Sequence, residues 1–189
     1  MRENNKESLT QKVVLAGKYG FWYKDLKNLF EKENWDFFLL DKSYPEPREL
    51  FRIQNINVLL YAVDFRQDLI HGTDANKKLL DFLRLAQENH VERVYLLSTV
   101  EAIPVGDKII NQMAHIAENI LLDWSSSAGI AATVIRLPEI YGLGADSCDG
   151  WVARWMNALY DGAVTYDIPA GEGKRCFLYV DDAVYGIYK

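Results

Sequence analysis

Cysteine is scarce in this sequence, and there is no excess of positive charge. Only Cys148 and Cys176 occur among 189 residues, which is too few for a disulfide scaffold, and their spacing matches no zinc motif. We therefore expect no metal site and two reduced thiols, as in a cytoplasmic protein. Asp and Glu number 27 against 21 Lys and Arg, a net charge of −6. This balance argues against general binding to nucleic acid or to anionic membranes.

Long apolar runs are missing as well. No window approaches the roughly 18 uninterrupted apolar residues that a transmembrane helix needs. The N-terminal stretch MRENNKESLTQK is polar and lacks the apolar core of a signal peptide. We expect a soluble protein of the cytoplasm that has no membrane partner.

The composition is otherwise globular, with 49% hydrophobic and 25% charged residues, and the length suffices for one core. Residues 1–11 are expected to form a flexible tail, and residues 12–189 a single domain. Short apolar runs alternate with stretches of helical spacing. Strands are expected at 12–16, 36–40, 57–63, 93–98, 131–137 and 176–180, helices at 21–33, 73–89, 109–124 and 151–160, and a proline-punctuated loop at 43–47. This alternation predicts an α/β fold, a three-layer doubly wound parallel sheet of Rossmann type, with ligands beyond the carboxyl ends of the strands.

The first predicted strand runs directly into a glycine turn. Gly17 would allow the tight turn, and Gly20 would let the backbone approach a pyrophosphate on the helix N-terminus. Asp41 follows Gly20 by 21 residues, where a carboxylate can accept a hydrogen bond from a ribose hydroxyl. Tyr23 takes the third glycine position, so we expect it to push the helix outward or to point into the ligand site. The alternative is that Gly17 and Gly20 merely make a turn in an α/β sheet and bind no nucleotide.

Four segments, in order, resemble the extended short-chain dehydrogenase/reductase family, and within it the NAD-dependent epimerase/dehydratases that act on nucleotide sugars. The glycine turn is similar to the family's GxxGxxG. The segment 91–104 (VERVYLLSTVEAIP) resembles its strand ending in Ser-Ser or Ser-Thr. The segment 134–144 (VIRLPEIYGLG) resembles R-x-x-N-x-Y-G-P-G, and 173–183 (GKRCFLYVDDA) resembles R-D-F-x-x-V-D-D. The resemblance covers about residues 12–189.

The resemblance implies a dinucleotide at the glycine turn. NAD is favoured over NADP because Asp41 would repel a 2′-phosphate, although Lys42 beside it softens this preference. The expected cofactor contacts are Gly17, Tyr19, Gly20, Phe21, Asp41, Lys42, Ala62 and Ser98. The expected contacts to a nucleotide sugar are Thr99, Glu139 and Arg175, of which Arg175 matches a family arginine that contacts the diphosphate.

The catalytic pair of the family, Tyr-x-x-x-Lys, does not occur in residues 99–130. In the family the tyrosine transfers the proton, and the lysine lowers its pKa and holds the nicotinamide ribose. When the register is anchored on Glu118, Ile110 takes the tyrosine position and Ala114 the lysine position. A shift by one residue brings in Asn111 and His115, which restores neither group.

The sequence departs from the family's motifs at further positions around the expected site. Val100 replaces the acid of the dehydratase-like segment, and Glu139 replaces the asparagine of R-x-x-N, which adds negative charge beside a nucleotide sugar. Fifteen residues between Asp41 and Asn57 are too few for the family's third strand. With its end at Lys189, the chain is expected to lack most of the C-terminal substrate lobe.

Few residues remain that could replace the acid/base. The weak candidates are Thr99, Glu101, His115 and Tyr141; for Thr99 a strand-end role, for His115 a packed or solvated role and for Tyr141 packing are the alternatives. Asp181 and Asp182 are expected as N-cap and first-turn acid of a last helix, rather than as metal ligands.

Three functions stay open at this point. The first is a catalytically degenerate family member that binds or senses a nucleotide. The second is an active epimerase, dehydratase or reductase with a rearranged acid/base. The third is a protein-interaction module without a cofactor, which forms a homo-oligomer or binds a protein partner through the aromatic helix 151–160.

Overall fold

The computed structural model of the chain describes residues 10–17, 19–40, 47–63, 75–102, 109–145, 150–162 and 175–189. The strands are β1 (Lys12–Gly17), β2 (Asp36–Leu39), β3 (Val58–Ala62), β4 (Arg93–Thr99), β5 (Ala131–Leu137), β6 (Glu139–Tyr141) and β7 (Phe177–Tyr179). The helices are α1 (Tyr23–Lys32), α2 (Pro47–Gln54), α4 (Ala75–Glu88), α5 (Ile109–Ala128), α6 (Trp151–Tyr160) and α7 (Val180–Tyr188), with a 3-10 turn, η1, at Val100–Ala102.

Five parallel strands form the main sheet, in the order β2-β1-β3-β4-β5. This arrangement confirms the predicted doubly wound α/β fold. No strand in the described ranges flanks β2 on its outer side, which agrees with the expected loss of a third strand. The short strands β6 and β7 form a separate parallel pair, with Glu139 opposite Phe177. Strand β6 was not predicted from the sequence, and the predicted last strand extends to Val180, which instead begins α7.

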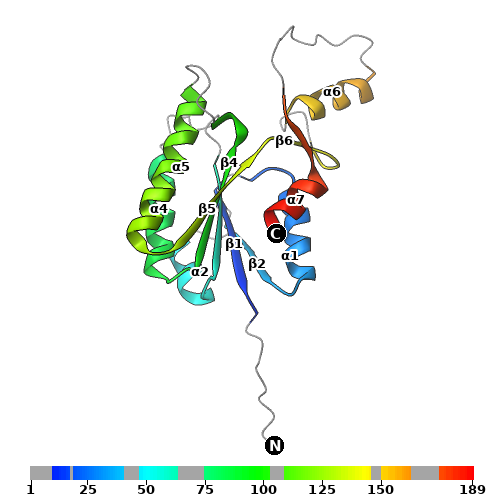
Figure 1. The fold of residues 1–189 in the computed structure, drawn as a ribbon. Coiled ribbons are helices and arrows are strands. Elements are labelled where there is room, and N and C mark those ends of the chain that lie inside the picture. The colour runs from blue at the N-terminus through cyan, green and yellow to red at the C-terminus, as the bar shows by residue number, and fades with distance from the viewer. Residues whose placement is uncertain are drawn as a thin grey trace, which may run out of the picture.

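Both faces of the sheet are buried, as the apolar strands predicted. Val14 and Ala16 of β1 belong to a core shared with α2, α4 and α5. Val13 and Leu15 point the other way, into a core shared with α1 and α7. Figure 1 shows these two helical layers on opposite sides of the sheet, with α4 and α5 in one and α1 and α7 in the other. Alternate residues of each strand therefore support different layers.

Helix α2 was not predicted: only a loop, and no helix, was expected between the second strand and β3. Pro47 is the first residue of the helix, a position where its missing N–H costs no hydrogen bond. Leu50 and Phe51 are buried in the core. The proline therefore starts a helix here. The other part of the predicted loop lies outside the described residues.

The aromatic helix α6 has the bounds that its periodicity predicted. Figure 1 places it beyond the carboxyl end of the main sheet, near β6. Among the described residues, no helix combines the length and the apolar character needed to cross a membrane.

Candidate functional site

Gly17 ends β1 directly beside Ala62, the last residue of β3. Its φ of +86° lies in the left-handed region, and a Cβ at this position would overlap the carbonyl oxygen of Ala62. Only glycine fits a backbone that is both left-handed and this close to a neighbouring strand. The structure thus gives the first glycine of the turn a steric reason, namely its close approach to the backbone of β3.

The rest of the turn is lined with aromatic rings. Tyr23 is the first residue of α1, and its ring centre lies 5.0 Å from that of Tyr19. Trp22 is buried, and its indole stands beside Gly20, where a Cβ would lie 2.9 Å from the indole nitrogen. Trp22 and Leu26 therefore fill the contact between α1 and the sheet. The half-buried Tyr23 packs against Tyr19 and against the core between α1 and the sheet.

Two predicted cofactor residues, Asp41 and Lys42, lie outside the described residues, so their roles remain predictions. Phe21 lies in the turn before α1, and a Cβ on Gly144 would lie 3.7 Å from its ring. The turn after β1 and the segment after β6 are therefore neighbours.

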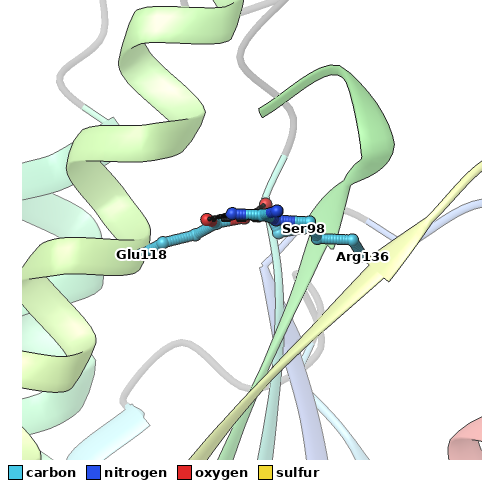
Figure 2. Close-up of polar contacts among 3 residues, drawn as sticks. All are labelled: Ser98, Glu118 and Arg136. Carbon is cyan, nitrogen blue, oxygen red and sulfur yellow. Dashed lines mark hydrogen bonds and ion pairs between the residues drawn. The ribbon is translucent and has the colours of Figure 1, made fainter. Parts of the chain in front are cut away.

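A buried polar cluster joins β4, β5 and α5 (Figure 2). Ser98 and Arg136 are register partners on the two strands, and Glu118 of α5 lies between them. The Ser98 hydroxyl donates to Oε1 of Glu118 at 2.7 Å. Arg136 donates from Nε to Oε1 at 3.0 Å and from Nη2 to Oε2 at 2.6 Å. The hydroxyl of Ser98, predicted to contact a cofactor, is thus engaged by the protein itself.

The charge of Glu118 is well compensated although the side chain is 4% exposed. Burial by itself raises the pKa of Glu118. The hydrogen bonds from Arg136 and Ser98, with the charges of Arg136 and His115, outweigh burial and hold this pKa below its ordinary value. The carboxylate is therefore stable as an anion. In the sequence, Glu118 serves only to anchor the register of Tyr-x-x-x-Lys, and no local signal predicts this cluster.

The helix α5 carries the two positions matched to Tyr-x-x-x-Lys. Ala114, at the lysine position, is fully buried in the core with Ala117 and Leu121. Of Ile110 and Asn111 only the backbone is described. His115 is partly buried, and its Nδ1 has no hydrogen-bond partner among the described residues.

The other acid/base candidates are spread over different elements. Thr99 is the last residue of β4, and Glu101 follows in η1, where its side chain is not described. Tyr141 lies in β6, with its ring 5.6 Å from that of Tyr179 in a T-shaped contact, which fits the expected packing role. With His115 on α5, the four candidates come from four elements, whereas the tyrosine and lysine of Tyr-x-x-x-Lys share one helix.

Glu139 has a structural partner that the sequence analysis did not foresee. Its Oε1 accepts hydrogen bonds from the backbone N–H groups of Trp151 and Val152, the latter at 3.2 Å. A carboxylate at this place satisfies free N–H groups and interacts favourably with the positive end of the helix dipole. Gly150 is needed beside it, because a Cβ there would collide with the carboxylate.

The last helix differs from its prediction at one position. Tyr179 is the N-cap of α7, and Asp181 and Asp182 both lie in the first turn. The prediction of an aspartate N-cap was therefore wrong, whereas that of first-turn acids is confirmed. Within the described residues, no cluster of three metal-ligating side chains occurs.

Arg175 lies just before β7 and is exposed. Its guanidinium carbon is 4.8 Å from the ring centre of Trp151, the first residue of α6. This places the predicted diphosphate-binding arginine beside the N-terminus of α6.

Several solved structures of the same fold contain a nucleotide sugar, a dinucleotide or both. UDP-glucose 4-epimerase from Thermotoga maritima, solved with UDP-glucose, shares 15% identity over 93% of this chain and 71% of its own, with a TM-score of 0.78. CapF, a capsular polysaccharide assembling protein from Staphylococcus aureus, shares 17% over 94% of this chain and 48% of its own, with a TM-score of 0.76. MoeE5, solved with UDP-glucose and NAD, shares 15% over 94% of this chain and 70% of its own, with a TM-score of 0.74. These similarities show the fold. No curated protein matches the chain.

The sequence itself matches the family model described as "NAD dependent epimerase/dehydratase family". The match spans residues 71–189, which is more than half of the chain, and it begins after the glycine turn. The chain belongs to the NAD-dependent epimerase/dehydratase family.

Proposed function

We propose that this chain is a nucleotide-binding member of its family that has lost the Tyr/Lys proton-transfer chemistry. Its ligand at the glycine turn is a dinucleotide, with NAD preferred over NADP because Asp41 repels a 2′-phosphate. The observation that carries the binding half is Gly17, where a left-handed backbone without a side chain takes the chain from the end of β1 into the turn before α1. A pyrophosphate needs a close backbone approach next to a helix N-terminus.

The loss of proton transfer is supported by Ala114. A fully buried alanine at the lysine position supplies neither the charge that lowers a tyrosine pKa nor a donor for a ribose. Solved structures of the same fold were obtained with NAD in MoeE5 and with NADP in a GDP-L-fucose synthetase from Naegleria fowleri. We infer that the binding half of this activity is retained and that the chain holds or senses a nucleotide.

The decisive experiment is isothermal titration of the purified chain with NAD, NADH, NADP and UDP-glucose. We expect NAD to bind at micromolar concentration, about −8 kcal/mol at 1 μM, and Gly20→Trp to abolish this binding by filling the turn. Gly186→Ala is the matched control, because a Cβ at Gly186 in α7 meets nothing within 4 Å. The proposal fails if no dinucleotide binds, or if the purified protein converts a nucleotide sugar at an enzyme-like rate.

A second candidate is an active enzyme with a different acid/base. It is favoured by His115, whose buried Nδ1 has no hydrogen-bond partner among the described residues. Replacing Glu101, His115 and Tyr141 one at a time in an active preparation tests this idea. Unchanged rates in all three variants would exclude it.

A third candidate is an interaction module. Three apolar side chains of α6 are largely exposed: Met156 by 62%, Leu159 by 65% and Tyr160 by 92%. Such a group of exposed apolar side chains is unusual on a surface that binds no other protein. Light scattering after size exclusion tests it: an oligomer that is insensitive to NAD favours this function, and a monomer argues against it.

A further inference from the structure

The outer edge of β5 is the longest unpaired strand edge in the described part of the chain. All seven residues of β5 pair with β4, and no described strand lies on the other side of β5. At the opposite edge of the sheet, β2 has only four residues. An edge strand presents N–H and C=O groups with which another strand can pair, and proteins protect such edges with proline, lysine or a short strand. The segment AATVIRL of β5 contains neither proline nor lysine.

Hydrogen bonds within the sheet show which main-chain groups of β5 point away from β4. On β4, the carbonyl group of Leu97 accepts a hydrogen bond from the N–H group of Val63, which follows β3. Leu97 therefore faces β3, and the alternate residues of β4 face β5. In a parallel ladder, the register partner of a residue that faces the neighbouring strand faces away from that strand. The residues of β5 that face outward are thus Ala132, Val134 and Arg136, and no other described backbone group bonds to them.

Apolar side chains on both faces of β5 are incompletely covered. Val134 lies at the margin of the core shared with α4 and α5, and Ile135 and Leu137 lie at the margin of the core shared with α1 and α7. All three are partly buried. A further strand beside β5 would therefore cover apolar surface on both faces of the sheet, in addition to pairing the outward main-chain groups.

Helix α5 carries an exposed apolar side chain beside this edge. Leu122 is 48% exposed and follows Glu118, which bonds to Arg136 of β5, by four residues. Four helical residues span about 6 Å and two strand residues about 6.6 Å, so Leu122 of the antiparallel helix is level with Val134. Ile120 lies about 160° away around the helix axis and packs against the core that α5 shares with α4. Leu122 is thus on the flank of α5 turned away from α4 and toward the open edge.

We propose that two copies of this chain pair antiparallel through β5, about a two-fold axis at Val134, and form a dimer with one continuous sheet. This register uses every outward residue: Val134 pairs with its own counterpart, and Ala132 pairs with Arg136 of the partner subunit. The contact is isologous, as in most homodimers. It sets a small side chain beside a large one and opposes no like charges. A second copy therefore fits this edge through the sequence of β5 itself.

The same axis brings the two α5 helices together. Glu118 bonds to Ser98 of β4 and to Arg136 of β5, so α5 lies above these two strands. Strands are spaced about 4.8 Å apart, which places the two α5 helices about 10 Å apart across the axis, within the usual range of helix packing. Leu122 then meets its counterpart and loses its exposure. The dimer goes beyond the proposed function and does not depend on it.

The first test is sedimentation equilibrium of the full chain from about 1 to 100 μM, where we expect a dimer. Leu122→Glu should weaken this dimer at least about tenfold, because two carboxylates would face each other across the axis. Ile116→Glu is the matched control. Ile116 is 47% exposed on the same helix, but it lies about 160° around the axis from the buried Ala114 and so faces away from the sheet. This variant should dimerise like the unmodified chain within about twofold.

A second variant tests the strand pairing itself. Val134→Pro removes the central outward N–H group and no hydrogen bond within the chain, since an edge strand accepts proline where the N–H group faces outward. It should weaken the dimer at least about tenfold, because two hydrogen bonds at the axis are lost. The circular dichroism spectrum should stay the same, which shows that the variant folds.

Amide hydrogen exchange, followed by NMR, gives a readout along β5. The outward amides of Ala132 and Arg136 should exchange at least about tenfold faster in Leu122→Glu than in the unmodified chain, because only the dimer protects them. The amides of Thr133 and Ile135 face β4 and should exchange at nearly the same rate in both. This alternation along one strand is expected for edge pairing and for no contact that involves helices alone.

The proposal is overturned if the chain is a monomer at about 100 μM, or if the outward amides exchange equally fast in the unmodified chain and in Leu122→Glu. It is also overturned if Ile116→Glu dissociates the dimer as strongly as Leu122→Glu. Leu159→Glu separates this dimer from an interaction through α6, where Leu159 is exposed: dissociation by this variant, with Leu122→Glu still dimeric, assigns the contact to α6 and overturns the pairing through β5. NAD binding bears on the dinucleotide proposal alone.

Discussion

Arg136 holds both carboxylate oxygens of Glu118, with Nη2 2.6 Å from Oε2 and Nε 3.0 Å from Oε1 (Figure 2). The two side chains differ in exposure: that of Glu118 is 4% exposed and that of Arg136 is 40% exposed. The pair ties α5 to β5, and Ser98 adds β4. Three elements that border the carboxyl end of the sheet therefore depend on one buried carboxylate.

Removal of Arg136 should be costly, because Glu118 would remain buried without its counter-charge. We expect Arg136→Met to lower the free energy of unfolding by about 2–3 kcal/mol, somewhat less than for a fully buried pair because water can reach the arginine side. Urea denaturation measures this. The control is Arg84→Met, which breaks an exposed ion pair with Asp81 and should cost no more than about 0.5 kcal/mol. Equal losses in the two variants would contradict a structural role for the cluster.

The same cluster predicts a dependence of stability on pH. The pKa of Glu118 is lowered in the folded chain from its ordinary value of 4.5. A lowered pKa means that its contribution to stability is present above about pH 4.5 and is lost as the pH falls through the folded value. Glu118→Gln should therefore be less stable than the unmodified chain at pH 7, and this difference should shrink at about pH 3.

The control for this measurement is Asp123→Asn, which removes an exposed carboxylate further along α5. Its stability difference from the unmodified chain should be small and nearly the same at both pH values. A stability difference for Glu118→Gln that does not shrink on acidification would contradict the lowered pKa.

Two glycines offer a matched test of the turn after β1. Gly17→Ala should cost at least about 2 kcal/mol, because the backbone is left-handed and a Cβ would overlap Ala62. Gly186→Ala lies in α7 with open space around it and should stabilise the chain by up to about 1 kcal/mol. Thermal unfolding followed by circular dichroism compares the two. If both substitutions have the same effect, the close approach of β1 and β3 is wrong.

Helices and strands were predicted well where the signal lies within the residues of the element itself. The bounds of β5 and α6 follow the apolar run and the helical spacing that the sequence contains. Helix α2 was missed because Pro47 marks a loop as readily as a first helical residue. Strand β6 is only three residues long and exists through its pairing with β7. Such pairing between distant segments leaves no local trace in the sequence.

In the candidate site, too, local features could be predicted from the sequence and contacts between distant segments could not. The position of Gly17 after a strand follows from the sequence, whereas its contact with Ala62 requires the register of β1 and β3. Ser98, Glu118 and Arg136 are 18 to 38 residues apart. They meet only because Ser98 and Arg136 pair across β4 and β5 and α5 packs against both strands. A motif can mark each of these residues, but the interaction among them arises from the tertiary structure.

The position matched to the catalytic lysine can be tested by restoring the lysine. Ala114 is fully buried in the core, so Ala114→Lys would force a long cation among apolar side chains. We expect a loss of about 3 kcal/mol or more in the free energy of unfolding. The control is Gln112→Lys, an exposed position on the same helix, which should change stability by less than about 0.5 kcal/mol. If Ala114→Lys folds with unchanged stability, this position is open to a ligand, and the argument for lost chemistry weakens.

Substitutions of Glu139 distinguish a helix-capping role of this residue from a role in substrate binding. As a cap, its oxygen accepts hydrogen bonds from the N–H groups of Trp151 and Val152, and an amide oxygen can do the same. Glu139→Gln should therefore cost only about a few tenths of a kcal/mol and Glu139→Ala about 1 kcal/mol. Hydrogen exchange at the amides of Trp151 and Val152 should accelerate in the alanine variant and much less in the glutamine variant. If both variants exchange like the unmodified chain while UDP-glucose binding changes, the carboxylate acts on the ligand and not on the helix. Equal acceleration in the two variants would instead mean that the charge of Glu139, and not its hydrogen bonds, holds the start of α6.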